Sequence, residues 1–275
     1  MIIDGHHHIA GDTAPILASM ERLGIDCTVL VGVGVNDLNV VTIRDSLIFR
    51  MPWLLKTVGV WKSKAIVRSR ALQEALLPQP DNERVAKAIR DFPNRFRGFA
   101  FVNPAHPQAV AEVENRLAAG FCGIKMALLQ YPVSLESPEM FALCEIANSR
   151  RVPVFFHQGV TPATSNPEAI FKRFSKVSFI IAHAGVQYFG EAIELARAYP
   201  NVWLDTSSYF VTAAKLQQLI RELGPKKMVF GSDVPVMAFD QAEALNKIIQ
   251  LPISEHDRTA ILGDNLQRIL DNAKN

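Results

Sequence analysis

The sequence has few cysteines, almost no net charge and no long apolar run. Three of its 275 residues are cysteines, Cys27, Cys122 and Cys144, and none lies in a Cys-x-x-Cys motif, which excludes a disulfide-stabilised scaffold. The 29 Lys and Arg residues nearly balance the 27 Asp and Glu residues, which argues against nucleic acid as a partner. The apolar runs are only as long as a strand, so we expect neither a membrane span nor a membrane partner.

The beginning of the chain also lacks the basic and then apolar segment that a secretory leader would have. Together with the odd number of cysteines, this predicts a cytoplasmic protein. Hydrophobic residues make up 49% of the chain and charged residues 20%, so it has the material for a large core. Its length is typical of a single (β/α)8 barrel, which takes about 250 residues.

Short apolar runs alternate with stretches of helical pattern along the chain. Near-continuous apolar strands are typical of a parallel sheet that is buried on both faces. The alternation predicts an α/β protein with a (β/α)8 TIM barrel. An open doubly wound sheet is the alternative, which is disfavoured because no Gly-x-Gly-x-x-Gly follows the first run. The eight expected strands are residues 1–3, 27–33, 98–102, 123–128, 153–156, 177–182, 202–204 and 228–230.

One segment, residues 36–80, interrupts this alternation, because it is too long for an ordinary loop between a strand and a helix. It contains Trp53 and Trp61, and its seven basic residues outnumber its three acidic ones. We interpret residues 1–275 as one barrel domain in which residues 36–80 are a helical lid inserted after the second strand. The lid is expected to attract an anionic substrate and to enclose it with Trp53 and Trp61. A helical cap with a solvated face is the alternative.

Three consecutive histidines follow the first apolar run. In an extended strand, side chains two residues apart point the same way, so Asp4, His6 and His8 are expected on one face and His7 on the other. Two imidazoles at this spacing, at the carboxyl end of a barrel strand, are suited to bind one divalent ion. A remnant of a purification tag and a pair of incidental surface histidines are the alternatives.

Three further polar residues stand at the ends of apolar runs. His157 follows the fifth expected strand, His183 the sixth and Asp233 the eighth. In a TIM barrel these strand ends meet at the rim that carries the active site. Burying a carboxylate beside imidazoles is costly unless a cation or hydrogen bonds compensate. A bound metal ion accounts for all of these residues together.

At these residues the chain resembles the amidohydrolase superfamily, and most closely its amidohydrolase-2 branch of metal-dependent hydrolases and decarboxylases of the aminocarboxymuconate-semialdehyde decarboxylase type. The resemblance covers nearly the whole chain. It implies that one metal ion, commonly Zn²⁺ with Mn²⁺ as an alternative, is bound by His6, His8, His157 and Asp233. It also implies that His183 lies just beside the metal and contacts substrate or water. The matching motifs are Asp4-x-His6-x-His8, Gly123-Ile124-Lys125, Phe156-His157, Ala182-His183-Ala184-Gly185, Gly231-Ser232-Asp233 and Leu262-Gly263-Asp264-Asn265-Leu266-Gln267-Arg268.

The role of Lys125 is ambiguous. In binuclear relatives a lysine on the fourth strand is carbamylated and bridges two metals, whereas the pattern around Lys125 resembles the mononuclear branch. We therefore expect Lys125 to bind a substrate carboxylate or to form an ion pair inside the barrel. Asp205 also matches the family and could support a metal ligand through a hydrogen bond. Ser207 and Ser208 are expected to act as structural caps.

Two reactions are open to such a site. The first interpretation is a metal-dependent hydrolase that cleaves an ester, lactone or amide of a small anionic substrate with metal-activated water. Asp233 would be its general base, and His183 would orient the water or the polarised oxygen. The alternative is non-oxidative decarboxylation of an unsaturated or aromatic carboxylic acid by the same residues. A barrel that binds a metal or ligand without catalysis is a third interpretation.

The outer helices of such a barrel could support a homodimer, but no surface patch in the sequence marks one.

Overall fold

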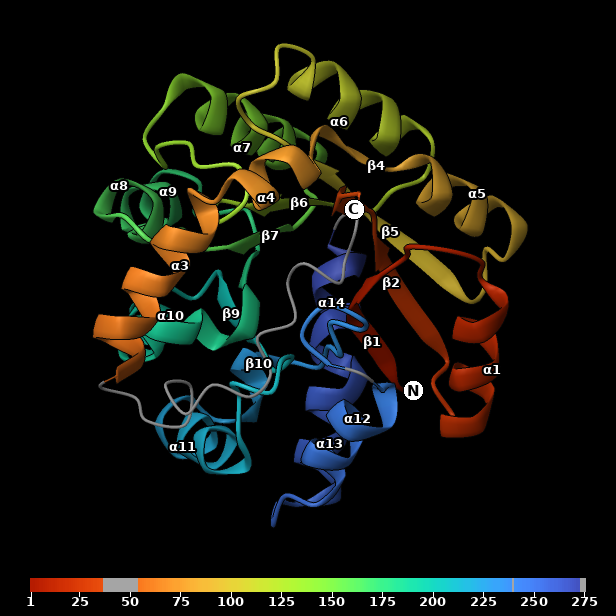
Figure 1. Ribbon diagram of the computed structural model, residues 1–275. Helices are drawn as coiled ribbons and strands as arrows, with labels where there is room; N and C mark the ends of the chain where they lie inside the picture. The colour runs from red at the N-terminus through yellow and green to blue at the C-terminus, as the bar shows by residue number, and fades with distance from the viewer. Residues whose placement is uncertain (37–53, 239, 273–275) are drawn as a thin grey trace.

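The computed structural model describes residues 1–36, 54–238 and 240–272 of the chain. Eight parallel strands form one sheet in the order β1-β2-β5-β6-β7-β8-β9-β10, and helices surround it, as Figure 1 shows. A parallel bridge between His7 and Val234, with a 2.9 Å hydrogen bond from Gly5 N to Phe230 O, joins the first strand to the end of the last. The predicted TIM barrel is confirmed. Its strands are β1 (Ile3–His8), β2 (Cys27–Val31), β5 (Phe96–Val102), β6 (Gly123–Ala127), β7 (Val154–His157), β8 (Phe179–Ile181), β9 (Val202–Asp205) and β10 (Met228–Val229).

Local sequence signals start and stop many of the helices. Ser137 Oγ accepts a hydrogen bond from Met140 N at 3.2 Å and begins α7 (Pro138–Arg150), and Thr212 begins α11 (Ala213–Leu223) in the same way. Gly24, in the left-handed conformation, ends α1. The longer helices are α1 (Ala14–Leu23), α5 (Glu83–Asp91), α6 (Ala109–Ala118), α7 (Pro138–Arg150), α10 (Phe189–Ala198), α11 (Ala213–Leu223) and α12 (Gln241–Ile249). The shorter ones are α8 (Pro162–Ser165), α9 (Glu168–Arg173), α13 (Glu255–Thr259) and α14 (Asn265–Asp271).

The barrel interior is filled by large apolar side chains from alternate positions of the strands. Phe99, Phe155 and Ile180 are buried there, and Leu266 and Ile269 of α14 pack against the same cluster. A solid interior of this kind leaves room for a ligand only at the rim of the barrel, where the strands end.

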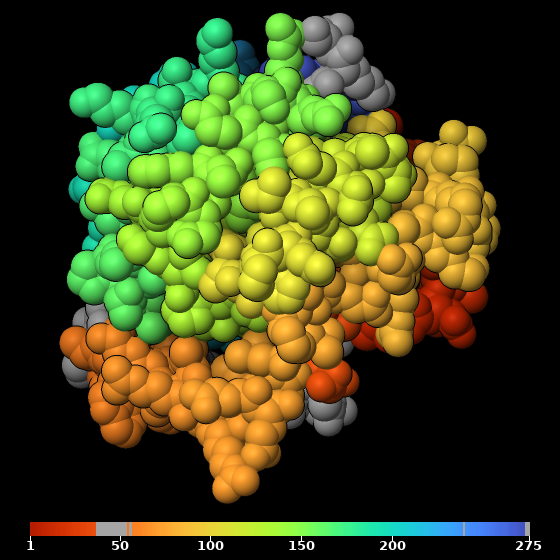
Figure 2. All heavy atoms as spheres, turned by 90° about the horizontal axis from the view of Figure 1, so that it is seen from above, coloured from red at the N-terminus to blue at the C-terminus, as the bar shows by residue number. Residues whose placement is uncertain are grey.

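The segment between β2 and β5 carries the predicted helices, but its base is a two-stranded antiparallel sheet. Strand β3 (Val33–Val35) pairs with β4 (Leu76–Asp81), and between them lie the π-helical turn η3 (Leu55–Gly59), α3 (Val60–Val67) and α4 (Arg70–Ala75). The Tyr131 hydroxyl lies 3.0 Å from Gly34 O and 2.9 Å from Leu77 O, so it fixes both strands to the barrel. In Figure 2 this segment (orange) projects at one side of the molecule.

In the parts of the chain that the structure describes, no helix combines the length and the apolar character that crossing a lipid bilayer requires.

Gly5 offers a test of how closely β1 approaches its neighbours. A Cβ at this position would lie 2.6 Å from Leu266 Cδ2 and 2.9 Å from Phe230 O. We expect Gly5→Ala to lower the free energy of unfolding by about 1–3 kcal/mol, because the carbonyl oxygen cannot give way without moving the backbone. Urea denaturation measures this change.

Gly11→Ala is the matched control, since no heavy atom lies within 4 Å of the Cβ that it would add. The two variants should therefore differ in stability. Equal free energies of unfolding would mean that the contact between β1, β10 and α14 is looser than the distances indicate.

Candidate metal centre and active site

A cavity of about 130 Å³ opens at the carboxyl ends of the strands. Six residues predicted from the sequence line it together, although they come from five different strands and the loops that follow them. This is the rim at which TIM barrels carry their active sites. The six residues are His6, His8, Lys125, His157, His183 and Asp233.

A β-bulge in β1 changes which side chains face this cavity. Asp4 pairs with Thr28, and His7 pairs with Leu30, so one additional residue lies in β1 between the two pairs. The expectation that Asp4 shares a face with His6 and His8 is wrong for this reason. The Asp4 carboxylate instead lies beside His7, with a distance of 3.6 Å between Oδ2 and Nδ1.

Asp4 serves to hold the last strand end against the first strand. Its Oδ2 accepts hydrogen bonds from Ser232 Oγ at 2.6 Å and from Gln241 Nε2 at 2.8 Å, and its Oδ1 accepts one from Ser232 N at 2.9 Å. Asp233, which follows Ser232, is thereby fixed next to the histidines of β1.

His6, His8 and Asp233 form a compact group of metal-ligating atoms. Asp233 Oδ1 lies 3.3 Å from Nε2 of His6 and 3.3 Å from Nε2 of His8. Each of the three residues offers one possible ligand atom, and these three atoms all lie within 4.8 Å of one another. Asp233 is 1% exposed, and its Oδ1 finds no hydrogen-bond donor among the described residues. A buried carboxylate oxygen without a donor is costly unless a cation faces it.

Hydrogen bonds at the Nδ1 atoms of His8 and His157 fix the tautomers of these imidazoles. The Nδ1 atom of His8 donates to Gly32 O at 2.8 Å, and that of His157 donates to Gln158 O at 2.7 Å. Because a carbonyl oxygen only accepts, each Nδ1 carries a proton, and in the neutral ring Nε2 then has the lone pair. Metal-binding histidines are held in this way by a hydrogen bond at the other ring nitrogen. The donor set therefore fits a divalent ion.

Burial keeps the imidazoles of His6 and His157 neutral, as metal ligands must be. It lowers the pKa of His157 to about 4, with a further contribution from the nearby Lys125. Burial and Lys125 also hold the pKa of His6 well below its usual range. Burial by itself would raise the pKa of Asp233. The facing His6 and His183 lower it by more, so the pKa of this carboxyl is far below its ordinary value.

His157 lines the cavity but stands apart from the group of three. Its ring centroid is 5.1 Å from that of His183, and the two rings meet edge to face. Its function as a fourth metal ligand stays a prediction.

Lys125 lies next to the same group. Its Nζ is 3.0 Å from His6 Nε2 and 4.1 Å from the centroid of the Phe155 ring, and the side chain is 2% exposed. Burial lowers the pKa of Lys125 to about 8, against the opposing effect of Asp233 and Asp205. Among the described residues it contributes the only Lys or Arg side chain in the cavity wall, which suits the predicted contact with a substrate carboxylate.

His183 is held by a backbone of unusual shape. Four consecutive residues of the turn η4 (Ala182–Tyr188), from His183 to Val186, have positive φ values of 53°, 47°, 82° and 48°. Such values are strained for the three residues that are not glycine, and for β-branched Val186 above all. Asp233 has a φ of 58° as well. Strain thus concentrates at residues that line the cavity, and it directs His183 Nε2 to within 3.5 Å of Asp233 Oδ2.

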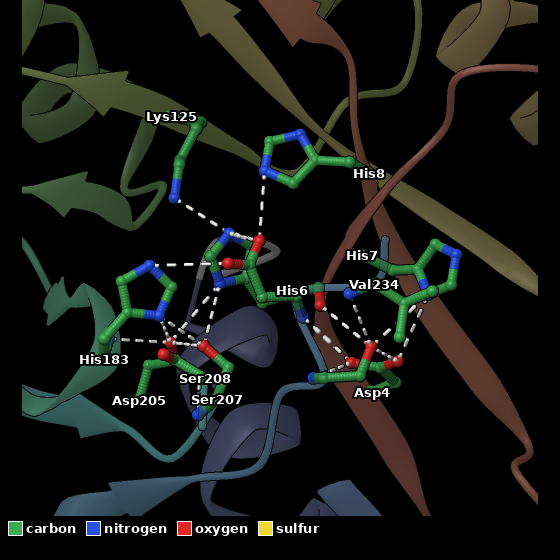
Figure 3. A network of polar contacts seen from close by, with 12 residues as sticks. Asp4, His6, His7, His8, Lys125, His183, Asp205, Ser207, Ser208 and Val234 are labelled. Carbon is green, nitrogen blue, oxygen red and sulfur yellow. Dashed lines mark hydrogen bonds and ion pairs between the residues drawn. The ribbon is translucent and has the colours of Figure 1, made fainter. Parts of the chain in front are cut away.

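Asp205 connects two of the histidines, as Figure 3 shows. It is fully buried, and its Oδ2 accepts a 2.9 Å hydrogen bond from His183 N and lies 3.3 Å from His6 Nδ1. Burial raises the pKa of the Asp205 carboxyl, while the facing His183 and the hydrogen bonds from His183 N and from Ser207 act to lower it. The sequence-based expectation that Asp205 supports a metal ligand agrees with this contact.

The aromatic residues at the cavity differ from those expected. Trp53 lies outside the described residues. Trp61 is 67% exposed and is not part of the cavity wall, which α3 reaches through Ser63 instead. Aromatic side chains in the wall come from Phe101 and from Tyr209 and Phe210, among others. Tyr209 and Phe210 follow the seventh barrel strand closely, and this position at a strand end was the signal available in the sequence.

Comparisons with known proteins agree with the predicted family and fold. The family model described as Amidohydrolase matches residues 62–271, so the chain belongs to this family. A search of curated proteins finds no match.

Several solved structures share the fold at low sequence identity. An uncharacterised TIM-barrel protein from Bordetella bronchiseptica is 16% identical, with a TM-score of 0.72 over 100% of this chain and 99% of that one. The 5-carboxyvanillate decarboxylase from Sphingomonas paucimobilis is 16% identical, with a TM-score of 0.66 over 98% of both chains. A dihydroxybenzoic acid decarboxylase from Polaromonas with bound manganese is 16% identical, with a TM-score of 0.67 over 98% of this chain and 96% of that one.

Metal binding is expected to depend on Asp233. Asp233→Asn keeps the shape of the side chain but removes its charge, so we expect the affinity for Zn²⁺ or Mn²⁺ to fall at least about tenfold. Elemental analysis after dialysis against the metal, followed by competition with a chelator, measures the loss. Asp12→Asn, at an exposed position, is the control. Tight metal binding by Asp233→Asn would contradict the assigned ligand set.

The burial of the histidines predicts how the stability of the metal-free protein depends on pH. Burial lowers the pKa of His183 to about 4, whereas the unfolded chain titrates at about 6.5. The unfolded state therefore binds more protons between these values, and stability falls as the pH is lowered from about 6.5 towards 4. The slope is at most about 1.4 kcal/mol per pH unit for each such histidine.

Urea denaturation at several pH values, with chelator present, measures this slope. His183→Asn should flatten the curve, while substitution of exposed His256 by Asn should not. An unchanged slope in His183→Asn would mean that His183 is not kept neutral by burial.

Proposed function

We propose that this chain is a metal-dependent decarboxylase that releases CO₂ from a small unsaturated or aromatic carboxylic acid without net oxidation. The residues that line the cavity carry the proposal. Its imidazoles, Lys125 and Asp233 gather together, while much of the remaining wall is apolar. A molecule with a carboxylate at one end and an apolar body fits such a wall. The apolar residues are Phe101, Ala127, Leu129, Val186, Phe210, Val236 and Met237.

The solved structures of similar fold support this reaction class. Two of the three described above are named as decarboxylases of aromatic acids, and one of these has manganese bound. In this chain His6, His8 and Asp233, with His157 as the fourth ligand, would hold a divalent ion, Zn²⁺ or Mn²⁺. When bound, the ion supplies positive charge that holds an oxygen of the substrate.

Lys125 and the apolar wall would position the substrate. The ammonium group of Lys125 binds a carboxylate or a neighbouring oxygen, and the apolar side chains contact the ring or diene. Apolar side chains solvate a charged carboxylate less well than water does, so beside this wall its conversion to neutral CO₂ would be favoured.

His183 and Asp233 would handle the proton. His183 Nε2, which lies 3.5 Å from Asp233 Oδ2, would take up a proton from solvent and deliver it to the carbon that carries the carboxylate. The bond from this carbon to the carboxylate then breaks, its electron pair stays with the carbon, and CO₂ leaves. The reaction consumes one proton, which solvent returns to His183.

Hydrolysis of an ester, lactone or amide is the second candidate, which the family description favours. It would use the same metal ligands to activate water, with Asp233 as the general base. The two reactions differ in their products, because hydrolysis releases acid and no CO₂.

A substrate panel separates the two reactions. The metal-loaded protein is incubated with hydroxybenzoates and unsaturated aliphatic acids labelled with ¹³C in the carboxylate, and with lactones and esters of similar size. We expect labelled CO₂, detected by mass spectrometry, from at least one acid. Asp233→Asn should lower this turnover by about 10²-fold or more, whereas Asp12→Asn should leave it unchanged. Acid release from a lactone or ester, with no labelled CO₂ from any acid, would overturn the proposal in favour of hydrolysis.

A further inference from the structure

The hydroxyl group of Ser207 lies between three groups of the site. Ser207 follows β9 and is fully buried. Its Oγ is in close contact with Asp205 Oδ2, lies 2.8 Å from His183 Nδ1 and lies 3.2 Å from His6 Nδ1. Figure 3 shows these contacts meeting at one point.

Ser207 has one hydroxyl proton, and its neighbours decide where that proton points. The Asp205 carboxylate also receives hydrogen bonds from His183 N at 2.9 Å and from Ser207 N at 3.0 Å, as expected of an ionised acceptor. An ionised carboxylate cannot donate, so Ser207 must donate its proton to Asp205. Towards the imidazoles Ser207 Oγ can then only accept. The proton of the 2.8 Å hydrogen bond therefore belongs to His183 Nδ1.

We propose that Ser207 is a positioning residue, which holds His183 in the tautomer with the proton on Nδ1 and the lone pair on Nε2. In this tautomer the lone pair on Nε2 faces the cavity beside Asp233, where it can take up a proton and then deliver it. The importance of this tautomer for turnover rests on the proposed function of His183, but the tautomer itself does not.

The local structure excludes the simpler function that the sequence predicted for Ser207. The next helix, α11, begins only at Ala213, and Thr212 caps it. The hydroxyl that serves the turn is that of Ser208, whose Oγ accepts a 3.2 Å hydrogen bond from Phe210 N. Ser207 is thus not a helix cap, and its Oγ faces the imidazoles instead.

Loss of the hydroxyl should affect His183 more than His6. Without Ser207 Oγ, His183 Nδ1 would still face Asp205 Oδ2, but at 3.7 Å, which is beyond hydrogen-bond distance. The His183 ring is then free to take the tautomer with the proton on Nε2. His6 Nδ1 keeps Asp205 Oδ2 at 3.3 Å, so the metal ligand stays oriented.

Three variants test the proposal: Ser207→Ala removes the hydroxyl, Ser207→Thr keeps it, and Ser208→Ala is the matched control at the neighbouring serine. Nitrogen-15 NMR of imidazole-labelled protein, metal-free and loaded with Zn²⁺, reports which ring nitrogen of His183 carries the proton. His183→Asn identifies the signal. We expect the proton on Nδ1 in the original chain, Ser207→Thr and Ser208→Ala, and a shift towards Nε2 in Ser207→Ala.

Kinetics provide the second measurement. Ser207→Ala should lower kcat about 10- to 100-fold, the usual effect of removing a residue that orients a functional imidazole, with KM and bound Zn²⁺ nearly unchanged. Ser207→Thr should restore most of kcat. If Ser207 were only structural, Ser207→Ala would lower the thermal stability but would not lower kcat selectively while leaving KM unchanged.

The outcomes that overturn the proposal are distinct from failure of the proposed reaction. A proton on Nε2 of His183 in the original chain refutes it whatever the variants do, even if Ser207→Ala does not fold. An unchanged tautomer in Ser207→Ala, or an equal shift in Ser208→Ala, also refutes it. If no acid is decarboxylated, the NMR result still decides the function of Ser207, since it needs no substrate.

Discussion

The site depends on one buried carboxylate, that of Asp205, which interacts with donors from three parts of the chain. It accepts the backbone N–H of His183 and that of Ser207, and it lies beside Nδ1 of His6. Burying a carboxylate away from water costs several kcal/mol unless such donors surround it. Moving any of these donors away would restore part of this cost, so the carboxylate keeps them in position. Through this group, strand β9 fixes the histidine of β1 and the histidine that follows β8. The imidazoles can then keep their Nε2 atoms turned towards Asp233.

The irregular backbone of the barrel lies where the functional side chains are. The bulge in β1 turns Asp4 away from the cavity, while His6 and His8 face it. The left-handed residues that begin at His183, and the positive φ of Asp233, place two further groups at the same rim. Regular strands would bury these side chains in alternation and could not direct them all to one point. Such deviations are stable only because the packed barrel beneath them holds their ends.

The cavity combines a polar group of residues with an apolar wall, and these two parts have different origins. The polar group comes mainly from strand ends, which are rigid and hold imidazoles and a carboxylate at the distances that metal ligation needs. Much of the wall comes from loops, including Val186, Phe210 and Met237, which can vary without disturbing the barrel. This division is typical of TIM barrels: residues at the strand ends determine the class of reaction, and the loops determine which substrate is bound.

The sequence by itself determined the barrel and the positions of His6, His8, His157, His183 and Asp233. Apolar strands of a parallel barrel all end at one rim, so the residue that follows each strand can be placed without coordinates. Only the tertiary structure decided that Asp4 faces away, that Trp61 is exposed, that β3 and β4 form a ribbon, and that Ser207 contacts two imidazoles. Periodicity specifies a face only while a strand stays regular, and contacts between residues far apart in the chain depend on the register of several strands at once.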